Sequence, residues 1–275
     1  MKSYNEVLVN LKKRKEGALV VFTVIGDPDY KTSLEIVKKI VDSGADILEL
    51  GIPFSDPIAD GRIIQAAYVR ALENGMNTDK AFKFVEDLRK YTDIPIGLLT
   101  YYNIVYQRGL EKFYQDAYKA GVNSVLIADL SIEEAVNVIK ISKKNKVDIV
   151  FMISQLSDDD RMKKIASASN GFIYFVSRLG VTGVRDEIQN STLSLIKKIR
   201  KFSDKPLYVG FGISKPQHVR DVIIAGADGA IVGSAVVNIV ERNLNDKDKL
   251  MNDLTNFIKQ LKNATKKSKD LKIGV

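Results

Sequence analysis

The sequence predicts an α/β protein built on a single (β/α)8 TIM barrel. Eight apolar segments, rich in Val, Ile, Leu, Phe and Tyr, are too short for helices and alternate with longer segments of helical periodicity. This alternation indicates parallel strands joined by right-handed crossovers. Eight units in 275 residues favour a closed barrel. The repeat count alone leaves an open doubly wound sheet as the alternative. The expected strands are Ala18–Ile25, Asp46–Gly51, Ile94–Thr100, Ser124–Asp129, Val147–Ser154, Gly171–Ser177, Pro206–Gly212 and Gly229–Gly233.

The composition excludes several kinds of functional site and a membrane-spanning protein. The chain has a net charge of +8 and no Cys, which excludes disulfides, thiolate catalysis and Cys-based metal sites and fits a reducing compartment. No apolar run approaches the roughly 18 residues of a membrane helix, so we expect a soluble, cytoplasmic protein that does not bind membranes. No interior linker marks a boundary, and we expect one domain over residues 1–275, with a solvated basic tail at 263–275.

Local signals mark where several helices begin and end. Asp29 to Ser33 supplies capping residues before a helix whose apolar face includes Leu34 and Val37. Gly44, Gly121 and Gly226 each follow a helical segment and are typical of helix ends.

Glu49 is the first candidate for catalysis. Side chains alternate along a strand, so Leu48 and Leu50 are expected to face the helices while Glu49 points into the barrel near the end of its strand. Apolar surroundings raise the pKa of a carboxyl toward the range of a proton shuttle at neutral pH. The alternative is a structural Glu paired with a Lys or Arg inside the barrel.

Asp60 is the second candidate. It lies eleven residues after Glu49, in a loop shaped by two prolines and a glycine, and could face Glu49 across a substrate at the same barrel mouth. The alternative is that Asp60 caps the helix expected over Ile63–Asn74. Asp56, in the same loop, has the same ambiguity, with the capping role favoured.

Glycines at three strand ends in the second half of the chain predict a phosphate site. They lie in Gly180–Gly183, in Gly210–Ser214 and at Gly233, where Ser234 precedes a short helix over Ala235–Glu241. Backbone N–H groups and a helix N-terminus bind anions, and barrels often bind phosphate at the loops after strands seven and eight. One such glycine pair is a weak signal, whereas three on the same face are a stronger one.

The remaining polar residues are weaker candidates for a functional site. The single histidine, His218, is expected to be a solvated helix residue, and Asp158–Asp160 a helix N-terminus and not a metal site. No lysine lies at a strand end, where a Schiff base would form. Asp129 is interpreted as a loop anchor. We expect no metal site.

The residues together resemble one known family. The run Glu49–Gly61, ELGIPFSDPIADG, closely resembles the signature of the tryptophan synthase alpha subunit family. The similarity covers nearly the whole chain and includes the segments Gly26–Pro28, Pro95–Leu99, Tyr101 and Asn103, Ile127–Leu130, Ser177–Arg178, Gly180–Gly183, Gly210–Ser214 and Gly226–Ala235.

The resemblance implies a barrel with an extra N-terminal helix, within residues 1–16, over its bottom. It implies cleavage of indole-3-glycerol phosphate to indole and glyceraldehyde 3-phosphate in tryptophan biosynthesis. It also implies a beta-subunit partner in an alpha2beta2 complex. That partner would use pyridoxal phosphate, whereas this chain is expected to need no cofactor.

The family chemistry assigns roles to residues of this sequence. Glu49 gives and takes protons, and ionised Asp60 accepts the indole ring N–H. The indole pocket is matched by Phe22, Leu99, Tyr101, Leu126, Ala128, Met152 and Tyr174. The phosphate site is matched by Gly183, Phe211, Gly212, Gly233 and Ser234. Asp56 is assigned to the loop that would face the partner.

Three departures from the family pattern affect loops. Arg62 replaces the usual Pro next to Asp60, where it could pair with Asp60 or face the partner. Ser131–Ile132 and Gln155–Leu156 replace Pro-containing segments.

Three alternative functions stay open. One is a related phosphate-binding barrel enzyme such as indole-3-glycerol phosphate synthase, which needs a catalytic lysine. Another is a non-catalytic regulatory subunit, which does not need two carboxylates. Nucleic-acid binding rests on net charge alone, without an aromatic-basic array, and no nucleic-acid partner is expected.

Overall fold

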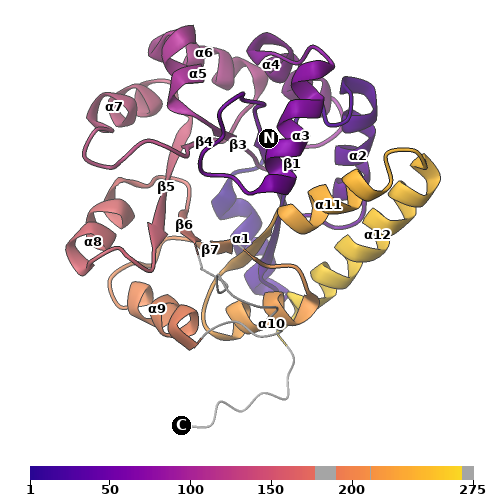
Figure 1. The fold of residues 1–275 in the computed structure, drawn as a ribbon. Helices are drawn as coiled ribbons and strands as arrows, with labels where there is room; N and C mark the ends of the chain where they lie inside the picture. The colour runs from indigo at the N-terminus through magenta and orange to yellow at the C-terminus, as the bar shows by residue number, and fades with distance from the viewer. Residues whose placement is uncertain (177–189, 211, 268–275) are drawn as a thin grey trace.

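The computed structural model describes residues 1–176, 190–210 and 212–267, and within them it confirms the barrel. Eight parallel strands pair in chain order and close, β1 with β8 (Figure 1). Each strand lies within a predicted segment. The strands are β1 Ala18–Val24, β2 Ile47–Gly51, β3 Ile96–Thr100, β4 Ser124–Ile127, β5 Asp148–Ser154, β6 Ile173–Val176, β7 Leu207–Gly210 and β8 Gly229–Val232.

Helices surround the strands on the outside (Figure 1). Two helices, not one, separate β2 from β3 and β3 from β4. The helices are α1 Tyr4–Lys13, α2 Tyr30–Asp42, α3 Arg62–Glu73, α4 Thr78–Arg89, α5 Tyr102–Arg108, α6 Leu110–Ala120, α7 Val136–Lys144, α8 Asp159–Ala168, α9 Asn190–Arg200, α10 Pro216–Ile224, α11 Ser234–Arg242 and α12 Lys247–Ala264. None of the helices in these described ranges is long and apolar enough to cross a bilayer.

Helix boundaries follow the capping residues in the sequence. Asp29 caps α2 by accepting the Thr32 N–H at 2.9 Å, and Asp158 caps α8 by accepting the Arg161 N–H at 2.7 Å. The second contact confirms that Asp158–Asp160 mark a helix start. Gly121 ends α6 in the left-handed region, at φ 89°, where glycine adds no Cβ strain.

Alternation along β2 places Glu49 inside the barrel. Leu48 and Leu50 belong to the apolar layer between strands and helices, whereas Ile47 belongs to the cluster inside the barrel. Glu49 is level with Phe22 of β1 and Gly97 of β3. The period of two therefore puts a carboxyl between apolar neighbours, as the sequence predicts.

The N-terminal helix closes the bottom of the barrel. Tyr4 of α1 reaches among the strands, where its hydroxyl and that of Ser124 lie 2.6 Å apart. Gly97 makes room for it, since a Cβ there would lie 3.1 Å from the Tyr4 hydroxyl. A capping box between Ser3 and Glu6 fixes the start of α1. The bottom is thus filled by side chains, and the mouth is left for ligands.

The start of the predicted tail is packed, which corrects the expectation of a solvated end from residue 263 onward. Ala264 and Thr265 are buried, and the backbone of Lys266 pairs with that of Glu16 in an isolated antiparallel β-bridge. Residues 268–275 lie outside the described part of the chain. The apolar stripe of α12 runs to Leu261 and Ala264, so burial continues past the point where Lys becomes frequent.

Candidate active site

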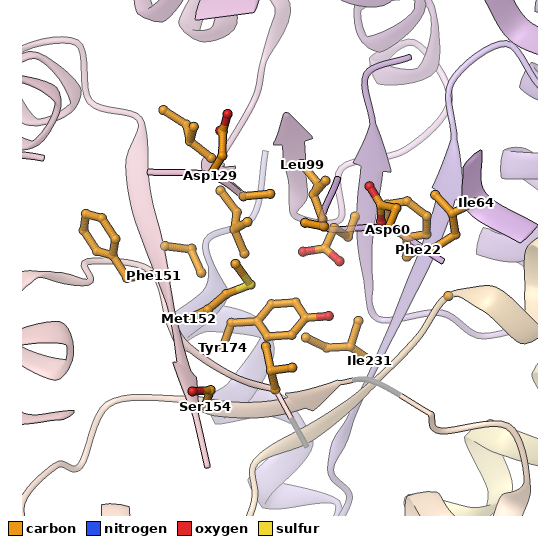
Figure 2. A pocket seen from close by; sticks show the side chains of 18 of the residues that line it. Phe22, Asp60, Ile64, Leu99, Asp129, Phe151, Met152, Ser154, Tyr174 and Ile231 are labelled. Atoms are coloured by element: carbon orange, nitrogen blue, oxygen red, sulfur yellow. The ribbon is translucent and has the colours of Figure 1, made fainter. Parts of the chain in front are cut away.

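A cavity of about 1040 Å³ opens at the carboxyl ends of the strands. Figure 2 shows the Tyr174 ring pointing into it from β6, near Met152 of the adjacent β5. Asp60 and Phe22 lie across the cavity. Eleven of the residues assigned from the sequence line this one space, and they are Phe22, Glu49, Asp60, Leu99, Leu126, Ala128, Met152, Tyr174, Gly212, Gly233 and Ser234.

The Glu49 carboxyl faces the cavity without a partner. The residue is buried, and no hydrogen bond or ion pair to it forms within the described ranges. Burial, aided by the charge of Asp60, raises the pKa of Glu49 to about 8. No Lys or Arg neutralises it, so the structural alternative of a paired Glu does not apply. At neutral pH the side chain is a carboxylic acid that can donate a proton.

A hydrogen bond from a tyrosine fixes the position of the Asp60 carboxylate. The Tyr101 hydroxyl donates to Asp60 Oδ2 at 2.5 Å and accepts the Ala59 N–H at 3.2 Å. Burial raises the pKa of Asp60, and the nearby hydroxyls of Tyr101 and Tyr68 oppose that rise. Gly61, not Asp60, occupies the N-cap of α3. Asp60 therefore does not serve as the cap, and its carboxylate is presented to the cavity.

Tyr101 does not line the cavity. The ring is fully buried and stacks on Phe54 with centroids 5.0 Å apart. Strand β3 ends at Thr100, and Tyr101 begins the turn into α5, so the inward alternation stops one residue before it. The structure places the Tyr101 hydroxyl on Asp60, where it orients the carboxylate.

The other charged residues of the same loop point outward. Arg62 is exposed and forms no ion pair with Asp60 in this part of the structure. Asp56 is exposed as well, and its carboxylate accepts the Ser55 hydroxyl at 2.5 Å. Neither side chain lines the cavity, which leaves both on the outer surface of the loop.

Strand ends with glycines form the far end of the cavity. Gly212 has φ 74°, a left-handed conformation that favours glycine, and Ser214 lines the cavity two residues later. Gly233 is the N-cap of α11, and a Cβ on it would lie 3.1 Å from the Phe22 ring. Here the backbone and a helix N-terminus face the space, which suits an anion. Gly183 and Phe211 lie outside the described residues.

An ion-pair cluster joins the two ends of the site. Arg70 of α3 contacts both carboxylate oxygens of Asp27, at 2.7 and 3.0 Å, and Glu241 of α11 at 3.2 Å. Asp27, in the turn after β1, is almost fully buried, so the bidentate pair fixes α3 to that turn. The contact between Arg70 and Glu241 joins α3 to α11. Helix α3 follows Asp60, and α11 begins at Ser234. The cluster therefore holds the acidic end and the glycine end at a set distance.

Sequence reasoning missed several lining residues. Ile64 lies on α3, and Val150 and Ile231 point inward from β5 and β8, so the strand alternation could have found the last two. Loop residues complete the opposite wall, and they are Leu130, Ser131, Ile132, Gln155, Leu156 and Ser157. No periodicity marks such loops in a sequence.

Two further polar residues interact with the loops that follow the strands, and one of them, Asp129, also lines the cavity. Asp129 accepts the Tyr102 N–H at 2.7 Å, which confirms it as a loop anchor. His218 is buried, and its Nδ1 accepts the Ser214 N–H at 3.3 Å. The prediction of a solvated His218 is wrong, because the His218 side of α10 packs against the loop that follows β7. No group of His, Asp or Glu suited to a metal occurs among the described residues.

The geometry offers acid–base chemistry on a flat ligand with an anionic end. A protonated carboxyl and a second carboxylate share an apolar slot, and glycine N–H groups lie at its other end. The family model described as tryptophan synthase alpha chain matches residues 8–266. The chain belongs to the tryptophan synthase alpha chain family.

Curated relatives in this family cover almost the full length. A tryptophan synthase alpha chain from Methanothermobacter thermautotrophicus is 46% identical over 253 residues, which are 92% of this chain and 94% of that protein. One from Francisella tularensis is 44% identical over 263 residues, 95% of this chain and 98% of that one.

Solved structures of the family share the fold. The tryptophan synthase alpha chain of Legionella pneumophila has a TM-score of 0.89 at 30% identity, covering 98% of this chain and all of that one. A chain in a tryptophan synthase alpha2beta2 complex from Pyrococcus furiosus has a TM-score of 0.84 at 36% identity, covering 90% and 98%.

Proposed function

We propose that this chain, as a member of that family, cleaves indole-3-glycerol phosphate to indole and glyceraldehyde 3-phosphate by a retro-aldol reaction. The observation that carries the proposal is the pair Glu49 and Asp60 in one cavity with the glycine-rich end. The apolar residues Phe22, Leu99, Leu126, Ala128, Met152 and Tyr174 would enclose the indole ring. Gly212, Gly233 and Ser234, with Gly183 and Phe211, would bind the phosphate.

Protons move through Glu49 in this reaction. The protonated carboxyl donates to C3 of the indole ring, and the ring becomes a cation. The resulting carboxylate then takes the proton of the hydroxyl on the adjacent side-chain carbon. The C–C bond breaks, its electron pair returns to the ring to give indole, and the former hydroxyl carbon becomes the aldehyde. One residue gives and recovers one proton, so Glu49 ends each cycle as it began.

Asp60 stabilises the cation. Its ionised carboxylate would accept the ring N–H, whose positive charge grows when C3 is protonated. Tyr101 already fixes the carboxylate, so little reorganisation is needed at that moment. The anchored phosphate holds the reacting carbon between the two carboxyl groups, which lowers the entropic cost of reaction.

We further propose a beta subunit as partner, in an alpha2beta2 complex like that of the Pyrococcus furiosus relative. Asp56, exposed on the loop after β2, is a candidate contact. The chemistry above uses only side chains of this chain, so the proposal places pyridoxal phosphate in the partner and no cofactor here. We propose a cytoplasmic location, which the lack of Cys fits. We also propose that residues 1–275 form one domain.

The competing functions make different demands. An indole-3-glycerol phosphate synthase needs a catalytic lysine, and no lysine is found among the described residues lining the cavity. The test is release of indole from indole-3-glycerol phosphate by the purified chain, alone and with a beta subunit. Indole release supports the proposal. Binding without cleavage under both conditions would identify a regulatory subunit instead.

The pH profile of cleavage should reflect both carboxyl groups. Glu49, with a pKa of about 8, is protonated below that pH, so kcat/KM should fall as the pH rises through 8. The raised pKa of Asp60 places its loss of charge above the ordinary range of Asp, and activity should fall again on acidification. Steady-state indole release between pH 4.5 and 10 would measure this. Activity constant from pH 7 to 10 would contradict the role of Glu49.

Gly233→Asp should weaken phosphate binding. The new side chain would meet the Phe22 ring and place a negative charge beside the expected phosphate. We expect KM to rise by roughly tenfold or more, since a like charge costs over about 1.4 kcal/mol in a partly buried site. Steady-state kinetics with an Asn5→Asp control, which adds the same charge at an exposed position on α1 outside the cavity lining, would test it. An unchanged KM for Gly233→Asp would remove Gly233 from the phosphate site.

A further inference from the structure

Tyr68 is a buried tyrosine that neither the sequence analysis nor the mechanism uses. It lies on α3, one turn after the cavity residue Ile64, and its side chain is fully inaccessible to solvent. The hydroxyl makes no hydrogen bond within ordinary geometry in the described part of the chain. A buried hydroxyl without a partner costs free energy, so this position calls for an explanation.

Neighbouring atoms place that hydroxyl beside the acidic end of the cavity. A Cβ on Gly51, two residues after Glu49, would lie 2.9 Å from the Tyr68 hydroxyl and 3.0 Å from the Phe22 ring. Phe22 itself lines the cavity. The phenol therefore reaches the carboxyl end of β2, next to a residue of the cavity wall, without lining the cavity itself.

Asp60 is the charged group that interacts most strongly with the Tyr68 hydroxyl. The Tyr68 hydroxyl lowers the pKa of Asp60, and burial together with the charges of Asp60 and Glu49 raises the pKa of Tyr68. The titratable groups facing Asp60 are Glu49 from β2, Tyr101 from the end of β3, Tyr68 from α3 and Tyr174 from β6. No basic side chain forms an ion pair with Asp60 among the described residues, so hydroxyls are the donors on hand for its charge.

We propose that Tyr68 is a positioning residue that shares Asp60 with Tyr101, its hydroxyl donating a second hydrogen bond to the carboxylate when the substrate is bound. This rests on the proposed function. With two donors behind it, Asp60 stays ionised and keeps one oxygen directed at the ring N–H. The Tyr68 hydroxyl, which has no partner among the described residues, is the donor available for this bond. Tyr68 does not line the cavity, so it would act through Asp60 and not on the reacting atoms.

Tyr68→Phe removes this hydroxyl and keeps the ring. Tyr114→Phe is the matched control, because Tyr114 is also fully buried with an unpartnered hydroxyl but lies on α6, away from the cavity lining. We expect Tyr68→Phe to lower kcat roughly tenfold with KM within about twofold, as for loss of one hydrogen bond to a charged group. It should also move the acid limb of the pH profile up by about one pH unit. Tyr114→Phe should leave both unchanged.

Two measurements on the full chain separate the outcomes. Wild-type kcat, KM and pH profile retained by Tyr68→Phe would overturn the proposal while leaving the proposed function intact. Absence of indole release by the wild type, with a beta subunit present, would overturn the function itself. A double-variant cycle on kcat, with Tyr68→Phe, Asp60→Asn and the two combined, reports on the hydrogen bond itself. Non-additive losses in kcat support a shared hydrogen bond, and additive losses contradict it.

Discussion

Glu49→Gln should abolish indole release. The amide is close in size and shape to the carboxylic acid, but it cannot deliver a proton to C3 or remove one from the hydroxyl. Loss of a general acid and base typically costs about 10²- to 10⁴-fold, and here one residue serves in both steps, so we expect roughly a thousandfold or greater loss in kcat. Binding of indole-propanol phosphate should stay within about threefold, because the phosphate and ring contacts persist.

The same substitution should stabilise the protein. Because burial raises the pKa of Glu49 above its unfolded value of 4.5, to about 8, stability from this group is present below 4.5 and lost as the pH rises to 8. Glutamine carries no such cost. Thermal unfolding should therefore show Glu49→Gln gaining on the wild type from pH 5 to pH 8. The exposed Glu73→Gln serves as a control that should change neither stability nor activity. Normal turnover in Glu49→Gln would remove Glu49 from the mechanism.

Asp60→Asn should lower kcat by roughly 10²- to 10³-fold, since it removes a fixed negative charge from beside a developing cation. The volume is unchanged, and the Tyr101 hydroxyl can still donate to the amide oxygen, so the loop should keep its shape. KM should change little because the charge matters most after C3 is protonated. Steady-state kinetics of indole release would measure the two constants.

Asp204→Asn offers a control for this variant. Asp204 is an exposed carboxylate on the turn before β7, outside the cavity lining, and its loss should leave kcat within twofold of the wild type. If Asp60→Asn affected KM alone, Asp60 would serve ground-state binding and the electrostatic role assigned to it would be wrong.

Periodicity explains why much of the barrel can be predicted. Leu48 and Leu50 alternate with Glu49, and that alternation alone decides which residue points inward. The glycines before Ser214 and Ser234 mark strand ends, where backbone must approach a ligand or turn sharply. Both signals are local and depend on residue type, so they need no knowledge of tertiary contacts.

Predictions were less accurate where the chain leaves the strands. Tyr101 continues the inward alternation of β3 in the sequence, but the strand ends before it and the ring turns under the loop after β2. Tyr68 on a helix is indistinguishable from ordinary core by pattern, and its meaning depends on Gly51 and Asp60 coming beside it in the fold. Such contacts are decided by packing between segments far apart in sequence.

A crystal structure with bound indole-propanol phosphate tests the central claim most directly. We expect the ring N–H within hydrogen-bond distance of Asp60, the Glu49 carboxyl next to C3, and the phosphate at Gly212, Gly233 and Ser234. A ligand seated with its phosphate elsewhere, or with Asp60 turned away from the ring while Glu49 contacts no ligand atom, would contradict the account.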